Sequence, residues 1–390
     1  MASSKISAPA RRIPLQRPCT GRAEASAAAA AVLAQDLVGR GTTGLELEKR
    51  MAHDLGVRHL QLTTSGTHAL ELSTAVLGLG PGDEVILPSF TFSSVANCVL
   101  RQGAKPVFAD VKLDDLNLDP EDVARRVTKR TRAVIAVHYA GASSDLAALQ
   151  RLAKDKGLAL IEDAAHSVGA SWRGRALGTI GDAGCMSFHA TKNITCGEGG
   201  AFMTNSDVLA RRAECFREKG TNRSAFLRGE IKKYTWVSEG SSYVLSDVLA
   251  AILGEQWKRR EQINAERGRL YKLYMEKLSD LERSGYLRLP RISAEGRSSW
   301  HLFHVLLPNR RRRDRCLDGL KAKGIGAAFH YQPLHASPFA RKTLGCRDRL
   351  PVSERAGETL MRLPLFAGLR TEEVDYICAA LRGILTRRPS

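Results

Sequence analysis

A lysine and an aspartate that each follow a short apolar segment are the residues of this chain most suited to chemistry. Cys185–Phe188 is predicted to form a buried strand, and Lys192 lies in the loop after it, just before the glycine-rich Gly197–Gly200. Asp163 ends a second strand-like segment, Leu160–Asp163. A lysine is most often a solvated surface cation. Burial, however, lowers the pKa of its amine and frees it as a nucleophile, so this setting favours a catalytic lysine with an acid nearby.

A tight turn between a predicted strand, Leu60–Thr63, and a predicted helix, His68–Leu77, is a candidate anion site. The turn contains Ser65, Gly66 and Thr67. A helix N-terminus that follows a strand and a glycine turn directs free backbone N–H groups at a phosphate. Taken alone, a simple helix cap by Ser65 or Thr67 is the better explanation. Taken together with the lysine and the aspartate, phosphate binding is the better interpretation.

The first half of the chain alternates short apolar segments with helical or turn segments. Besides the strands named above, strands are expected at Glu84–Leu87, Pro106–Ala109, Ala133–Val137 and Ala201–Thr204. This alternation predicts an α/β fold with a mainly parallel sheet of seven strands and helices on both faces. Right-handed crossovers then place the strand ends at one edge, which brings Ser65, Asp163 and Lys192 together.

The pattern changes after Met203, where the elements become shorter and more polar. Strands are expected at His301–Leu307 and Ile325–Phe329. Helices are expected at Leu209–Lys219, Leu245–Leu278, Arg313–Lys323, Pro351–Arg362 and Thr371–Leu385, in addition to Ala25–Leu37 near the start of the chain. We therefore divide the chain into a disordered tail at residues 1–12, a large domain at 13–245, and a smaller C-terminal α/β domain at 246–390 that begins with a linking helix.

The composition is that of a soluble globular protein, with 43% hydrophobic and 26% charged residues. No apolar run is long enough to span a bilayer, so no membrane association is expected. The formal net charge is +18, which is compatible with nucleic-acid binding or with a solvated surface that attracts anionic ligands. The basic residues are spread along the chain, and the one dense cluster, Arg310–Arg313, has no aromatic partner motif. We therefore favour a solvated surface and no nucleic-acid partner.

The eight cysteines form no Cys-x-x-Cys pair, which argues against a zinc site or a disulfide framework. Free thiols in a reducing cytoplasm fit best. The segment Met1–Arg12 lacks acidic residues and has the composition of a transit peptide. A short disordered tail is preferred, because the segment that follows already has the character of a folded domain.

Four motifs carry a resemblance to a known family. They are Glu162–Ser167, Gly174–Gly181, Ser187–Lys192 and Gly197–Gly200. Together they resemble the DegT/DnrJ/EryC1/StrS family of pyridoxal-phosphate-dependent sugar aminotransferases, and the resemblance extends over residues 13–385. It implies the fold-type I aminotransferase architecture, pyridoxal 5'-phosphate as the cofactor and a homodimer with shared active sites. It implies no metal.

The resemblance also implies roles for individual residues. Lys192 would hold the cofactor as a Schiff base and then act as general base and acid, and Asp163 would keep the pyridine nitrogen protonated. His166 would lie near the phenolic oxygen or the ring face of the cofactor. Phe90 would stack on the ring, as an aromatic plane does against an electron-poor pyridinium. Ser187 would give a hydroxyl to the phosphate.

The remaining cofactor and substrate contacts follow from the same resemblance. Ser65, Gly66 and Thr67 would bind the phosphate. Many family members carry asparagine at the position of Ser242 and donate it to the phosphate of the neighbouring subunit, so the shorter Ser242 departs from the pattern. The substrate-binding residues would be Arg223, which suits a pyrophosphate because arginine binds phosphate oxygens bidentately, together with His330, Tyr331 and His335.

Three further segments favour one branch of the family. Val137–Gly141, Arg217–Ser224 and Gly240–Tyr243 resemble the enzymes that make dTDP-4-amino-4,6-dideoxygalactose for surface polysaccharides. This resemblance implies transfer of an amino group from glutamate to C4 of dTDP-4-keto-6-deoxyglucose. Transfer at C3, or to a UDP-linked keto sugar, is the alternative. A regulatory or nucleic-acid-binding protein that has kept the fold is a third interpretation, against which Lys192 argues.

Overall fold

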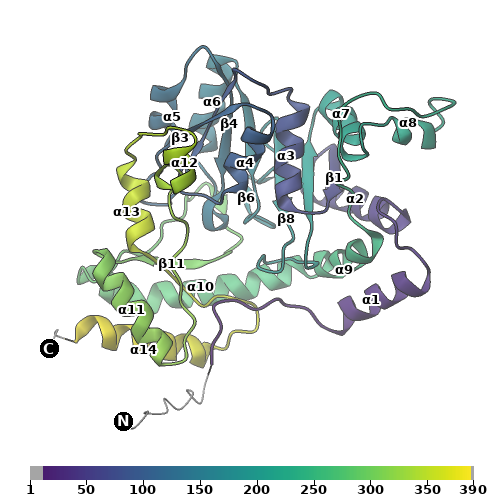
Figure 1. Cartoon of the computed structure of the whole chain (residues 1–390). Helices are drawn as coiled ribbons and strands as arrows, with labels where there is room; N and C mark the ends of the chain where they lie inside the picture. The colour runs from purple at the N-terminus through teal and green to yellow at the C-terminus, as the bar shows by residue number, and fades with distance from the viewer. Residues whose placement is uncertain (1–11, 388–390) are drawn as a thin grey trace, which may run out of the picture.

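A seven-stranded sheet lies at the centre of the larger domain in the computed structural model, which describes residues 12–387 (Figure 1). The strand order is β1-β9-β8-β5-β4-β2-β3. All neighbouring pairs are parallel except those of β9, which runs antiparallel to both β1 and β8. The strands are β1 His59–Thr63, β2 Glu84–Pro88, β3 Lys105–Ala109, β4 Thr131–Val137, β5 Ala159–Asp163, β8 Ala183–Ser187 and β9 Gly200–Thr204. The predicted mainly parallel sheet is confirmed.

Both faces of this sheet are covered. Successive side chains of a strand point to opposite sides, so alternate residues pack in different cores. In β2, Ile86 packs in one core with Met51, whereas Val85 and Leu87 pack in another core with Val95. Strands buried on both faces are continuous apolar runs, and this is the pattern of β2 and β4. The helices around the sheet are α2 Thr42–Leu55, α3 Gly66–Val76, α4 Ser94–Arg101, α5 Pro120–Arg126, α6 Leu146–Lys156 and α7 Asp207–Arg217.

The smaller domain is joined to the larger one by two consecutive helices, α9 Asp247–Lys258 and α10 Arg260–Arg283. Leu253 of α9 packs in a core of the large domain, whereas Tyr274 of α10 packs with Phe303 in the core of the small domain. A two-stranded antiparallel sheet pairs β11 with β12. The elements of this domain include β11 Phe303–Leu306, α11 Arg310–Ala322, α13 Pro351–Thr359, β12 Leu360–Leu363 and α14 Thr371–Thr386.

The first described residues belong in space to the smaller domain. Ile13 is only 1% exposed and lies in the small-domain core. Its N–H donates to the carbonyl of Gly324 at 2.9 Å, and its carbonyl accepts from Gly326 at 2.7 Å. The chain then crosses to α1 Arg22–Leu33, which packs on α9. Residues 1–11 of the predicted tail lie outside the described part of the chain.

Four predicted elements differ in the structure. The single helix predicted over Leu245–Leu278 is divided at Arg259 into α9 and α10. The segment Ile325–Phe329 is not a strand, because only Ile325 and Ala328 form isolated bridges, to Ile13 and Arg362. The helix predicted over Pro351–Arg362 ends at Thr359, and the buried apolar residues after it continue as β12. The helix predicted over Ala25–Leu37 is α1, which begins earlier and ends at Leu33.

The remaining elements are short. They are a three-stranded sheet of β6 Ser171–Trp172, β7 Arg175–Ala176 and β10 Gly296–Arg297, the helices α8 Arg223–Leu227 and α12 Pro338–Lys342, and the 3₁₀ turns η1 Tyr139–Gly141 and η2 Leu334–Ala336. Within residues 12–387, no helix combines the length and the apolar character that a membrane span requires.

Candidate active site

A cavity of about 420 Å³ opens where β5 and β8 end and α3 begins. Ligand sites of open α/β sheets lie at this carboxyl edge. The structure brings most of the predicted site residues together here: the cavity is lined by Ser65, Gly66, Thr67, Asp163, His166, Ser187, Lys192, His330 and Tyr331. The last two come from the segment after α11, so the smaller domain completes the cavity.

Lys192 lies in a loop whose conformation is fixed by backbone hydrogen bonds within the loop. The N–H of Lys192 donates to the carbonyl of His189 at 2.9 Å, and the N–H of Phe188 donates to the carbonyl of Gly199 at 2.8 Å. Burial lowers the pKa of the Lys192 amine to about 8, although the charge of Asp163 opposes this shift. A larger fraction of this amine is therefore neutral and nucleophilic at neutral pH than for an exposed lysine.

Asp163 is the last residue of β5 and is 6% exposed. Its Oδ1 accepts the N–H of Ala165 at 2.9 Å. Burial raises the pKa of this carboxyl, and the Ala165 N–H and the charge of Lys192 oppose the shift. A buried carboxylate is stabilised when a cationic N–H lies against it. Asp163 therefore suits a ligand that presents a protonated nitrogen.

The carboxylate of the preceding acid, Glu162, is bound entirely by groups of the protein. It is fully buried and accepts the N–H groups of Gly178, Ile180 and Gly181 at 2.9, 2.6 and 2.6 Å. It also pairs with His138 Nε2 at 2.9 Å. These contacts fix the end of β5, and they leave Asp163 as the acid of the pair that faces the cavity.

The N-terminus of α3 has the geometry of an anion site. Ser65 caps the helix, since its Oγ accepts the N–H of His68 at 3.1 Å. A Cβ added at Gly66 would lie 2.7 Å from the Cβ of Ser187, so the glycine allows the helix end to approach that residue. Gly66 and Thr67 are in the first turn of α3, where the backbone N–H groups have no carbonyl partner within the helix. Together with the Ser187 hydroxyl they can bind a phosphate.

Stacked histidines and tyrosines form another part of the wall. The rings of His166 and His301 are 4.2 Å apart, and those of His330 and Tyr331 are 3.7 Å apart. Burial and neighbouring positive charges hold the pKa values of the three histidines well below the usual 6.5, so they are neutral at neutral pH. Among the described residues, Nδ1 of His166 has no hydrogen-bond partner. It is free to bind a ligand.

The structure places Phe90 outside the cavity. Its ring is 1% exposed and lies 5.4 Å from the ring of Tyr139, inside a hydrophobic cluster. Phe92, which is 56% exposed, lines the cavity instead. The prediction that Phe90 stacks on a ligand ring is therefore wrong, and Phe92 is the phenylalanine of this loop that lines the cavity. The sequence has two phenylalanines in one loop, and nothing in it indicates which of them faces the cavity.

His335 also lies away from the cavity, contrary to the prediction that it binds substrate. Its ring is 0% exposed. Nδ1 pairs with Ser89 Oγ at 2.6 Å, and Nε2 pairs with Glu354 Oε1 at 3.1 Å. Both ring nitrogens are thus occupied, and the residue ties η2 to the end of β2 and to α13.

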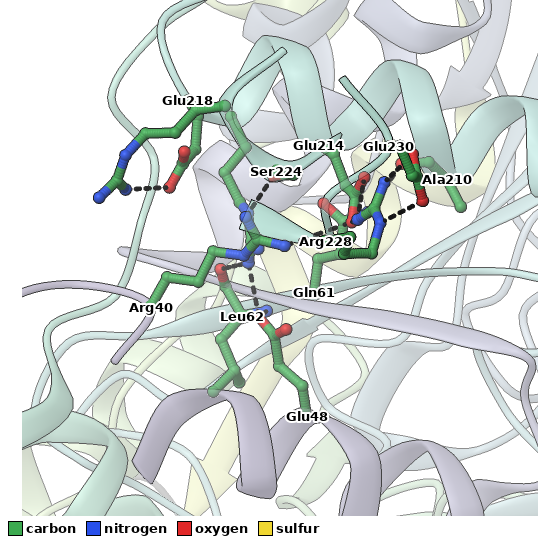
Figure 2. A network of polar contacts seen from close by, with 12 residues as sticks. Arg40, Glu48, Gln61, Leu62, Ala210, Glu214, Glu218, Ser224, Arg228 and Glu230 are labelled. Carbon is green, nitrogen blue, oxygen red and sulfur yellow. Dashed lines mark hydrogen bonds and ion pairs between the residues drawn. The ribbon is translucent and has the colours of Figure 1, made fainter. Parts of the chain in front are cut away.

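Arg223 and Ser242 are exposed and do not line the cavity of their own chain. Arg223 begins α8 and pairs with Glu218 at 3.7 Å, and Ser242 forms an isolated bridge with Glu218. Figure 2 shows the polar network that includes Glu218, in which Arg40 contacts Ser224 and Glu214. This network fixes α8 against α7. The predicted roles of Arg223 and Ser242 remain predictions that require a second subunit.

Several lining residues were missed by the sequence reasoning. Gln16, His301 and Arg362 all line the cavity. Arg362 left a signal, because it is the single charge in an otherwise apolar run from Leu360 to Leu365. The place of Gln16 in the cavity had no signal in the sequence, because nothing there indicates that the N-terminal segment packs against the smaller domain.

Comparison with known proteins decides what this cavity is. The DegT/DnrJ/EryC1/StrS aminotransferase family matches residues 20–382. The chain belongs to this family. It is similar to the aminotransferase TlmJ from Streptoalloteichus hindustanus, with 32% identity, a TM-score of 0.89 and coverage of 96% of this chain and 99% of that chain. It is also similar to DesV of S. venezuelae, solved in complex with a ketimine intermediate, with 31% identity, a TM-score of 0.87 and coverage of 97% and 100%.

A putative sugar aminotransferase from Streptococcus pneumoniae has been solved in PLP and PMP forms. Its PLP form is 25% identical, with a TM-score of 0.88 and coverage of 96% of this chain and 99% of that chain. This DegT-family chain is therefore a sugar aminotransferase with the fold-type I architecture, and its cofactor is pyridoxal phosphate. Within residues 12–387, no group of histidine, cysteine and acidic side chains could hold a metal ion.

The cavity residues fit this cofactor. The first turn of α3 and Ser187 suit its phosphate, and the buried carboxylate of Asp163 suits its protonated pyridine nitrogen. The unpartnered Nδ1 of His166 is available to a polar atom of the ring. The amine of Lys192, with its lowered pKa, suits the aldehyde.

Proposed function

We propose that this DegT-family enzyme transfers the amino group of glutamate to C4 of dTDP-4-keto-6-deoxyglucose. The product would be a dTDP-4-amino-4,6-dideoxyhexose of galacto configuration for surface polysaccharide synthesis. The observation that carries the aminotransferase chemistry is Lys192, whose amine has a pKa of about 8 in the cavity that Asp163 also lines. The choice of sugar is supported by the resemblance of Val137–Gly141, Arg217–Ser224 and Gly240–Tyr243 to one branch of the family.

When bound, pyridoxal phosphate supplies an aldehyde that takes up the amino group and a ring that withdraws electrons. Lys192 would hold the cofactor between turnovers, and its released Nζ would then move the proton at the reacting carbon. Asp163 would keep a proton on the ring nitrogen. The N-terminus of α3 would bind the phosphate, and Phe92 would lie against the ring.

Lys192 is the best proton carrier of the cavity. A general base works best when its pKa lies near the working pH, and that of Lys192 is about 8. The pKa values of His166, His301 and His330 are held well below 6.5 by burial and by nearby positive charges. Burial raises the pKa of Tyr331 well above its usual range. These rings can orient ligands as neutral groups.

We further propose a homodimer in which Ser242 and Arg223 reach the cavity of the neighbouring subunit. Both residues are exposed, and neither lines the cavity of its own chain. Large apolar side chains are exposed near Arg223, at the end of α1 and in the loop after α1: Trp236 is 76% exposed, Leu33 85% and Val38 70%. Figure 1 shows α8 and its loop projecting on the same side of the view as α1. Apolar patches of this kind mark interaction surfaces.

The reaction with defined substrates tests the proposed specificity. The enzyme would be supplied with glutamate and either dTDP-4-keto-6-deoxyglucose or its UDP-linked counterpart, and the product analysed by mass and by NMR. We expect preference for the dTDP sugar and an amine at C4. An amine at C3, or clear preference for the UDP sugar, would contradict the choice of substrate and leave the family assignment intact.

A cytoplasmic location is also proposed. It is supported by the cysteines, all eight of which are free thiols, since free thiols are typical of a reducing compartment.

A further inference from the structure

Arg362 carries hydrogen-bond donors that the protein does not use. It lies on β12 and lines both the main cavity and a smaller adjoining space, in each case together with Lys192 and His301. Its Nε donates to the carbonyl of Phe329 at 3.3 Å. No carboxylate in the described part of the chain lies within ion-pair distance of it. The two terminal nitrogens of its guanidinium are therefore available to a ligand.

Two buried arginines of the chain, Arg217 and Arg313, each have an acidic partner, and the buried Arg267 donates to the carbonyls of Trp300 and His301. Arg217 pairs with Glu48 and with the carbonyl of Leu62, each at 2.6 Å. Arg313 pairs with Asp314 at 2.6 Å. A desolvated guanidinium without an acid is costly, and a bound anion removes that cost. Arg362 has one carbonyl acceptor and no acid, and it lines the cavity, so its position points to an anionic ligand.

The groups around Arg362 leave its charge uncompensated. Burial lowers the pKa of its guanidinium, and the nearby hydroxyls of Tyr139 and Tyr331 oppose the shift. Both tyrosines keep their protons at neutral pH, because burial raises their pKa values. The charge of Arg362 in turn lowers the pKa of Lys192 and His330. The charge of Arg362 thus acts on the reacting amine together with the opposing charge of Asp163.

The position beside Lys192 identifies the anion. The phosphate of the cofactor is taken by the N-terminus of α3, and the pyrophosphate of a nucleotide sugar is separated from its C4 by the sugar ring. An amino-acid donor, by contrast, carries its α-carboxylate on the very carbon at which Lys192 moves the proton. We propose that Arg362 binds the α-carboxylate of the amino donor through two parallel hydrogen bonds. This inference rests on the aminotransferase function but not on the identity of the keto sugar.

The two half-reactions separate this role from the recognition of the sugar. The donor half is followed by the change in cofactor absorbance when L-glutamate is added without any sugar. The sugar half is followed with enzyme loaded with pyridoxamine phosphate and the keto sugar. Arg362→Met should slow the donor half by about ten- to a hundredfold, because a charged hydrogen bond is lost. The sugar half should be unchanged.

Four comparisons make the test more specific. Arg362→Lys should recover part of the rate, because it keeps the charge but not the fork. Arg311→Met removes the same charge from an exposed position on α11 and should change nothing. The dicarboxylate maleate, titrated by its effect on cofactor absorbance, should bind more weakly to Arg362→Met by a similar factor, and 4-aminobutyrate, which lacks an α-carboxylate, should react equally with both enzymes.

An unchanged donor half in an Arg362→Met enzyme that binds the cofactor would overturn the proposal, and so would a loss confined to the sugar half. If Arg362→Met does not fold, unaltered maleate binding in Arg362→Gln, which removes the charge and keeps a polar end, would be equally decisive. Failure of the wild-type enzyme to react with any amino acid would instead contradict the aminotransferase function itself.

Discussion

At the scale of single residues, the environment of Lys192 makes its reactivity depend on pH in a defined way. Only the deprotonated amine attacks an aldehyde, and burial lowers its pKa from 10.5 to about 8. The rate at which enzyme stripped of cofactor takes up pyridoxal phosphate should therefore rise with pH with a midpoint near pH 8. Stopped-flow absorbance measures this profile. A midpoint near that of a free lysine would show that the amine is solvated.

The role of Asp163 can be tested with an isosteric change. Asp163→Asn removes the charge that stabilises a proton on the ring nitrogen, and it keeps the shape of the side chain. Transamination should fall by about a hundred- to a thousandfold, while the cofactor remains bound through Lys192 and the phosphate site. Activity and cofactor absorbance are to be measured on the same preparation. Near-normal turnover would refute the assignment.

Whether a residue belongs to the site was predictable from the sequence where the pattern of strands and loops sets the position of its side chain. Asp163 and Lys192 follow apolar strands, so their position at the sheet edge follows from topology alone. The inward turn of Phe92 instead of Phe90 depends on side-chain packing inside one loop. The burial of His335 depends on two partners distant in sequence, Ser89 and Glu354. Neither could be derived from local pattern.

At the scale of elements, the approach of α3 to the end of β8 is the feature most sensitive to volume. A Cβ at Gly66 meets the backbone and side chain of Ser187, so Gly66→Val should shift the helix end and weaken binding of pyridoxal phosphate by about tenfold or more. Gly80→Ala is the matched control, because nothing lies within 4 Å of a Cβ there. Absorbance titration measures both affinities. Equal affinities would mean that α3 does not hold the phosphate.

The elements of the larger domain were predictable because βα alternation and buried strands leave strong local patterns. The smaller domain was harder, since its two strands are short and lie far apart in sequence. β12 follows α13 without a turn residue, so the apolar run after Thr359 extended the predicted helix. Arg362 was consequently assigned to a helix and its place in the cavity was missed. The crossing of the N-terminal segment at Ile13 is likewise a long-range contact.

At the scale of the whole molecule, the site is predicted to be complete only in a dimer. Lys192→Ala and Ser242→Trp chains should each be inactive alone. A mixed dimer of the two contains one site with both native residues, so refolding the chains together should restore part of the activity. Sedimentation of the mixture measures the assembly. A fully active monomer, or no recovery in proven mixed dimers, would contradict a shared site.

The net charge of +18 is also a property of the whole molecule. Part of the basic cluster on α11 is engaged within the protein, since Arg313 is buried and pairs with Asp314. We expect duplex DNA not to compete with the nucleotide sugar at physiological salt. Binding through several phosphates would instead give a steep dependence on salt concentration, which a titration at increasing ionic strength would reveal.

The attachment of the cofactor to Lys192 is the claim on which the account depends most. Reduction of the enzyme with borohydride makes the bond between a lysine and pyridoxal phosphate permanent, and peptide mass analysis then identifies the modified residue. We predict one reduced cofactor per chain, on the peptide that contains Lys192, and none in the Lys192→Ala variant. Modification of a different lysine, or full modification of Lys192→Ala, would contradict the account.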